Sequence, residues 1–162
     1  MGVLVQGNRA SVVELNCETD FVGRNRQFHE LLNEISYTNL ANAAEAGTNE
    51  VVVKEQPQEA MNGLKAKSGQ SLADLVALNI GQIGENIVLR RGVTLSAGEG
   101  VKLAGVTHPS ANINQMENHV QFGRYGTVVA YTNKEEGIIP EGQTVGKKRI
   151  LHFFNDSMPN PT

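Results

Sequence analysis

The sequence predicts an α+β fold, in which a small antiparallel sheet carries helices packed on one of its faces. Partly alternating β-branched residues mark two strands within residues 1–17. Two later segments repeat apolar residues at steps of three and four, as helices with one buried face do, and an extended β-branched run follows the second of them. We expect these elements to form a first subdomain, residues 1–98, followed by a partial second α+β subdomain, residues 99–162.

The chain opens with a predicted β-hairpin from Val3 to Cys17. Its two strands are expected at Gly2 to Gln6 and at Ala10 to Cys17. Between them, Gly7 and Asn8 can adopt the positive φ angles that a tight hairpin turn needs.

The first helix is expected to begin near Asn25, whose side chain can cap it. It should continue through an alanine-rich stretch to Ala46 and stop at Gly47. Its apolar stripe consists of Phe28, Leu31, Leu32 and Ile35.

Residues 48–70 are expected to form a poorly ordered, variable connection, because they combine Pro57 with glycines and many polar side chains. We predict only a short helical turn within it, around Glu59 to Lys67.

A second helix is predicted from Ser71 to Ile83. Asp74 stands three residues after Ser71, which is the spacing of a capping box. Gly84 occupies the position where a glycine commonly ends a helix. The strand expected at Ile87 to Leu95 completes the first subdomain.

The second subdomain should contain strands at Val101 to Thr107 and at Tyr125 to Thr132, with an exposed excursion from Ser110 to Phe122 between them. Because the sheet would be incomplete, its edges would be exposed. Exposed strand edges favour pairing with other chains, so we expect a possible homo-oligomer through the sheet edges.

The composition excludes several classes of protein. Hydrophobic residues make up 40% of the 162 residues and charged residues 19%, which is typical of a globular chain. The net charge of −3 disfavours a nucleic-acid partner, which usually requires a basic patch. We expect no membrane span, because no run of about eighteen apolar residues occurs. The single cysteine excludes an internal disulfide.

Within the stretch Glu14 to Asn25, a polar segment from Asn16 to Asp20 marks the change from strand to helix periodicity. Thr19 or Asp20 can cap the helix that follows, and Asp20 places a carboxylate at the positive end of the helix dipole. Phe21 and Val22 stand directly on this corner. From neighbouring residues alone we favour a hydrophobic staple, in which Phe21 and Val22 tuck under the helix start, over an exposed aromatic wedge at Phe21.

The string Glu-Leu-Asn-Cys-Glu-Thr-Asp-Phe-Val-Gly-Arg-Asn, residues 14–25, resembles the signature of the elongation factor Ts family. A second string, Ile-Gly-Glu-Asn at 83–86 running into Ile-Val-Leu-Arg-Arg, is similar to the family in the expected order. Weaker similarities lie at His108 with the turn 123–126, and at 145–152, which resembles the start of a family helix. The long insertion after His108 is more similar to the mitochondrial branch, which implies a mitochondrial location.

The resemblance implies a guanine-nucleotide exchange factor that binds the GTPase elongation factor Tu and promotes GDP release by disturbing its Mg²⁺ and phosphate site. No catalytic residue, metal site or cofactor of its own is implied. The corner associated with Mg²⁺ displacement maps onto Thr19, Asp20, Phe21 and Val22. Further partner contacts map onto Ile83, Gly84, Glu85, Asn86 and His108.

Two other interpretations of the sequence remain open. The family begins with a small ubiquitin-associated-like helical domain, which this chain is expected to lack together with most of the second core subdomain. A truncated member could keep the fold as a binding remnant without exchange activity. An enzyme could instead use Cys17 as nucleophile. Its candidate bases are His29, His108, His119 and His152.

Overall fold

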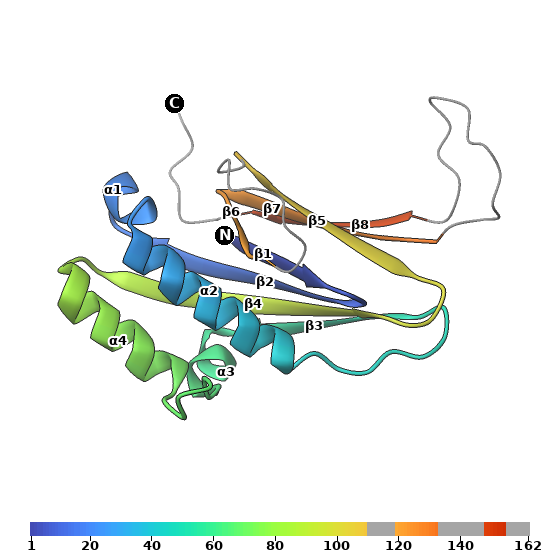
Figure 1. Ribbon diagram of the computed structural model, residues 1–162, viewed down its shortest axis with the longest axis horizontal. Helices are drawn as coiled ribbons and strands as arrows, with labels where there is room; N and C mark the ends of the chain where they lie inside the picture. Colours follow the sequence, from blue (N-terminus) through green and yellow to red (C-terminus); the bar gives the residue numbers. More distant parts are fainter. Residues whose placement is uncertain (110–118, 133–147, 155–162) are drawn as a thin grey trace.

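The computed structural model describes residues 1–109, 119–132 and 148–154 (Figure 1). Its larger sheet is five-stranded and antiparallel, with the order β3-β4-β2-β1-β6. These strands are β1 (Gly2–Gln6), β2 (Arg9–Cys17), β3 (Val51–Pro57), β4 (Ile87–Ala97) and β6 (Gln121–Phe122). The smaller antiparallel sheet has the order β5-β7-β8 and consists of β5 (Lys102–His108), β7 (Tyr125–Tyr131) and β8 (Lys148–Phe154).

Three layers result from this arrangement. The helices α2 (Arg26–Ala41), α3 (Gln58–Gly63) and α4 (Leu72–Ile83) cover one face of the larger sheet, and the smaller sheet lies on its other side (Figure 1). On the helix side, Val13 and Leu15 of β2 join a buried cluster with α2 and α4. On the other side, Val12 packs in a second cluster with residues of β5 and β7. The predicted α+β class is confirmed.

The smaller sheet approaches β1 closely because glycine occupies the points of contact. A Cβ atom added to Gly105 or Gly126 would lie 2.7 Å from a methyl group of Val3. A side chain at either position would therefore push β5 and β7 away from β1.

A buried polar network connects α2 to the sheet beneath it. The Asn39 side chain donates from Nδ2 to Ser11 Oγ at 2.8 Å and to the Val93 carbonyl at 3.2 Å. Its Oδ1 accepts a hydrogen bond from Gln56 Nε2 at 2.6 Å. Since all four residues are buried, these bonds replace water for polar groups that would otherwise be costly to bury.

Several predicted elements are confirmed, including the hairpin and the second helix. Ser71 and Asp74 form the complete capping box, and Gly84 ends α4 with φ 81°. The Asn25 side chain caps α2 as expected. Within the part of the chain that the structure describes, no helix combines the length and hydropathy needed to cross a membrane.

The expected poorly ordered connection at 48–70 is wrong over much of its length. Val51–Pro57 forms β3, which pairs with β4 along its whole length. Its half-exposed position at a sheet edge explains its polar residues, and Pro57 is tolerated at the last position of such a strand. The expected helical turn corresponds to α3, Gln58–Gly63.

The first long helix also ends earlier than predicted, at Ala41 instead of Ala46. Asn42 forms its C-cap, and its backbone N–H donates to the carbonyls of Asn39 and Leu40. The chain must then extend to reach the start of β3. This requirement outweighs the intrinsic helix propensity of the alanines that follow Asn42.

Two expectations in the second half are corrected as well. The helix expected to start within 145–152 is strand β8 where the structure describes it, from Lys148. This segment pairs with β7, whose backbone would otherwise form an edge. The end of the expected exposed excursion, 110–122, is not exposed: Val120 is buried and Gln121–Phe122 pairs with β1. Residues 110–118 lie outside the described part.

Substituting Asn39→Ala should lower the free energy of unfolding by about 2–4 kcal/mol, because the buried side chains of Ser11 and Gln56 lose their Asn39 partner and the bond to the Val93 carbonyl is lost as well. Urea denaturation monitored by circular dichroism measures this change.

The matched control is Asn42→Ala, which removes a single hydrogen bond, to the Thr38 carbonyl, at the exposed end of the same helix. Its cost should be about 1 kcal/mol or less. Equal losses for the two variants would contradict a special role for the buried network.

Candidate functional site

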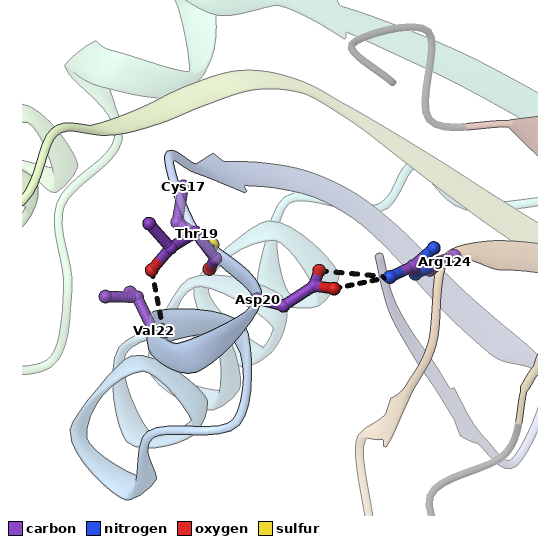
Figure 2. Close-up of polar contacts among 5 residues, drawn as sticks. All are labelled: Cys17, Thr19, Asp20, Val22 and Arg124. Carbon is purple, nitrogen blue, oxygen red and sulfur yellow. Dashed lines mark hydrogen bonds and ion pairs between the residues drawn. The ribbon is translucent and has the colours of Figure 1, made fainter. Parts of the chain in front are cut away.

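The predicted corner is a separate one-turn helix, α1 (Asp20–Gly23), between β2 and α2 (Figure 2). Thr19, and not Asp20, is its N-cap: the Thr19 backbone is extended and its Oγ1 accepts the Val22 N–H at 3.4 Å. Asn25 then caps α2 by accepting the Gln27 N–H at 2.7 Å. Two successive caps therefore fix the direction of the chain around the corner.

The two apolar residues of α1 differ sharply in burial. The Val22 side chain is buried and belongs to the cluster on the helix side of the sheet. Phe21 is 87% exposed, the largest exposure of any large apolar residue among those described. The staple expected from local rules is thus wrong for Phe21. The Phe21 ring therefore stands in solvent on a turn whose backbone is ordered by its cap.

The end of α4 lies beside this corner. The Thr19 hydroxyl lies within hydrogen-bond distance of both Glu85 carboxylate oxygens, at 3.0 and 2.9 Å, and donates to them. Ile83 is half-buried against the core, whereas Gly84 and Asn86 are exposed. The two motifs that carry the strongest resemblance therefore share one end of the molecule.

The third predicted contact, His108, is connected to the same corner through Arg124. The Arg124 Nη2 atom lies 3.0 Å from each carboxylate oxygen of Asp20 (Figure 2). The Arg124 backbone N–H in turn donates to the His108 carbonyl at 3.0 Å, at the exposed end of β5. All three predicted sets thus converge on one end of the two sheets.

Sequence reasoning did not assign a role to Arg124, although it included this residue in the glycine-rich turn 123–126. The ion pair joins positions 104 residues apart in the sequence. No periodicity or local spacing could have indicated it, because it arises only when the smaller sheet packs on β1.

The environment of Cys17 does not activate a thiolate. Its Sγ atom donates to the Thr19 carbonyl at 3.3 Å. Burial raises the pKa of the Cys17 thiol, and the negative charges of Glu85 and Asp20 raise it further. Nucleophilic cysteines have lowered pKa values, so this shift runs in the opposite direction.

The candidate base His29 is engaged elsewhere. Its Nε2 lies 2.8 Å from the Gly23 carbonyl, and its ring stacks on Phe122 with centroids 4.5 Å apart. Among the described residues, no group of three or more His, Cys, Asp or Glu side chains is arranged to hold a metal ion.

The family model and the related proteins that this chain matches carry the same family name. A family model described as "Elongation factor TS" matches residues 18–153. The mitochondrial elongation factor Ts of Drosophila melanogaster is 38% identical over 137 residues, covering 81% of this chain and 42% of that protein. The Salmo salar protein of the same name is 31% identical over 159 residues, covering 97% and 50%. The chain spans about half the length of the curated relatives that it matches.

Alkylation of Cys17 should show a pH midpoint above that of the same cysteine in the unfolded chain, because burial and the nearby carboxylates favour the protonated thiol. The measurement is the rate of iodoacetamide labelling against pH, for the folded chain and for the chain in denaturant.

Glu85→Gln should lower the midpoint in the folded chain, since Glu85 makes the larger of the two carboxylate contributions. Glu59→Gln, which changes an exposed carboxylate on α3, should leave it unchanged. A folded-state midpoint at or below the unfolded one would instead support the nucleophile hypothesis.

Proposed function

This chain belongs to the elongation factor Ts family, and on that premise we propose that it is a translation elongation factor that binds the GTPase elongation factor Tu and promotes release of GDP. Like the relatives that it matches, the chain is mitochondrial. The proposed activity is that of this chain, which spans about half the length of those relatives.

Nucleotide exchange needs no acid, base or nucleophile on the exchange factor. It needs a surface that binds the nucleotide-free GTPase more tightly than the nucleotide-bound form. Thermodynamic linkage then requires that the nucleotide be weakened by the same factor. Guanine nucleotides are held mainly through their phosphates and a bound Mg²⁺, so disturbing that site loosens the whole ligand.

The observation that carries the proposal is the exposure of Phe21 on an anchored turn. The phenyl ring stands in solvent at 87% exposure, while Val22 beside it is buried. The Thr19 hydroxyl donates a hydrogen bond to Glu85 and accepts one from the Val22 N–H. A ring presented this way loses little conformational entropy on binding, because the turn beneath it is already ordered. Aromatic residues, Phe among them, are enriched in the cores of protein interfaces.

We assign the roles around the ring accordingly. Phe21 enters the GTPase near its Mg²⁺ site, and Asp20 lies beside it. Thr19 and Val22 hold the turn from within the chain. The exposed end of α4 at Gly84 and Asn86, with Ile83, contacts the partner beside the ring, and His108 contacts it from the smaller sheet. Glu85 contributes indirectly, because its hydrogen bond to Thr19 helps to hold the N-cap of α1 in place.

The test is release of a fluorescent GDP analogue from mitochondrial elongation factor Tu, with and without this chain. Acceleration is expected, and Phe21→Ala should reduce it by about 30-fold or more, the effect of losing a dominant interface residue. The same substitution should change the free energy of unfolding by less than about 0.5 kcal/mol, because the ring makes little contact within the chain.

The control is Leu78→Ala, which removes another exposed apolar side chain, 49% exposed on α4, outside the predicted contact set. It should leave GDP release unchanged. Unfolding of Phe21→Ala would contradict the assignment of Phe21 as a contact residue. No acceleration by the folded chain would contradict the exchange function and favour a binding remnant of the same fold.

A further inference from the structure

We propose that Arg124 is a positioning residue: acting through Asp20, it holds α1 in the orientation that presents Phe21. The importance of this orientation for exchange rests on the proposed function, whereas the contact itself belongs to the chain alone. Arg124 lies outside every set of residues predicted from the sequence to contact the GTPase.

The backbone around Arg124 is firmly held, so its side chain can act as a fixed support. The Arg124 N–H donates to the His108 carbonyl at 3.0 Å, and the Gly123 N–H donates to the Met1 carbonyl at 3.1 Å. The Met1 amino group donates back to the Gly123 carbonyl at 2.7 Å. The turn is thereby fastened both to β5 and to the start of the chain.

Space at this turn is also limited. A Cβ atom on Gly123 would lie 2.7 Å from the Thr107 Cβ atom and 3.0 Å from the His108 nitrogen. Glycine therefore lets the turn lie directly against the end of β5. The position from which Arg124 reaches Asp20 is set by backbone packing and not by a flexible loop.

The same segment supports the other end of α1. Phe122 stacks on the His29 ring, at an angle of 8° between the rings, and His29 Nε2 lies 2.8 Å from the Gly23 carbonyl. Since a carbonyl can only accept, the ring donates from Nε2. Residues 122–124 thus contact α1 at its first residue directly and at its last residue through His29.

A helix of four residues requires such external support. One turn of helix fixes several backbone angles for very few hydrogen bonds and is not stable alone. Asp20 is the first residue of α1, where the helix dipole favours a negative charge. A single Arg124 nitrogen, Nη2, lies 3.0 Å from both Asp20 carboxylate oxygens and so adds a charge-assisted contact at that point.

The first experiment uses the isolated chain and NMR-detected amide hydrogen exchange. The Gly23 and Asn25 amides are bonded within the corner, to the carbonyls of Thr19 and Val22. Arg124→Gln should accelerate their exchange about two- to fivefold, the factor that an exposed ion pair is worth. Arg124→Lys should restore part of the protection. Unchanged exchange in Arg124→Gln would overturn the proposal.

A second variant pair tests whether Arg124 acts through Asp20. In an Asp20→Asn background, Arg124→Gln should produce no further acceleration, because the partner charge is already gone. A full additional effect in that background would overturn the proposal. The matched control is Arg9→Gln, which removes an ion pair with Glu45 at the opposite end of β2 and should leave the corner amides unchanged.

The GDP-release assay then separates this inference from the proposed function. If the wild-type chain accelerates release, Arg124→Gln should raise the chain concentration for half-maximal acceleration about two- to fivefold and leave the plateau unchanged. The reason is that the substitution makes α1 less ordered in the unbound chain, so ordering it on binding costs more, whereas the bound complex is the same. A lower plateau would overturn the positioning role. If the wild-type chain is inactive, the exchange function fails, and the amide measurements alone decide whether Arg124 positions α1.

Discussion

The arrangement of the site depends on the antiparallel pairing of β2 with β4. The last pair in this ladder is Cys17 with Ile87, where β2 leads into the corner and β4 begins. Two residues beyond each member stand Thr19 and Glu85, whose hydroxyl and carboxylate groups form a hydrogen bond. This side-chain hydrogen bond joins the two segments just beyond the end of the strand pairing. Two motifs 66 residues apart are therefore brought together by strand register.

A buried carboxylate reinforces this register. A bulge occurs in the ladder between Glu14 and Leu15, so that both Arg90 and Arg91 lie within reach of Glu14. The Glu14 side chain is fully buried, and Arg91 Nε approaches its carboxylate at 2.7 Å. A slip of one residue would leave this charge buried without its partners, at a cost of several kcal/mol. The ion pair therefore favours this alignment over one shifted by a residue.

Local chemistry determined those elements that the sequence predicted well. The caps at Asn25 and Ser71 and the αL glycine at Gly84 depend on neighbouring residues only, and their positions were correct. The strand β3 was missed because an edge strand tolerates polar residues and a terminal proline, although its first three residues are valines. Arg124 was missed because its contact with Asp20 depends on how one sheet packs on the other.

The orientation of Phe21 illustrates the same limit most clearly. Neighbouring residues on a helix point about 100° apart, so Phe21 and Val22 need not share the same environment. The sequence favours burial of Phe21, because hydrophobic staples are common and exposed aromatic wedges are rare. The polar contacts of Thr19 and Asp20 fix the turn the other way, with Val22 inside. The chain thus leaves the larger apolar side chain exposed, and in the proposed function its burial against the partner would favour binding.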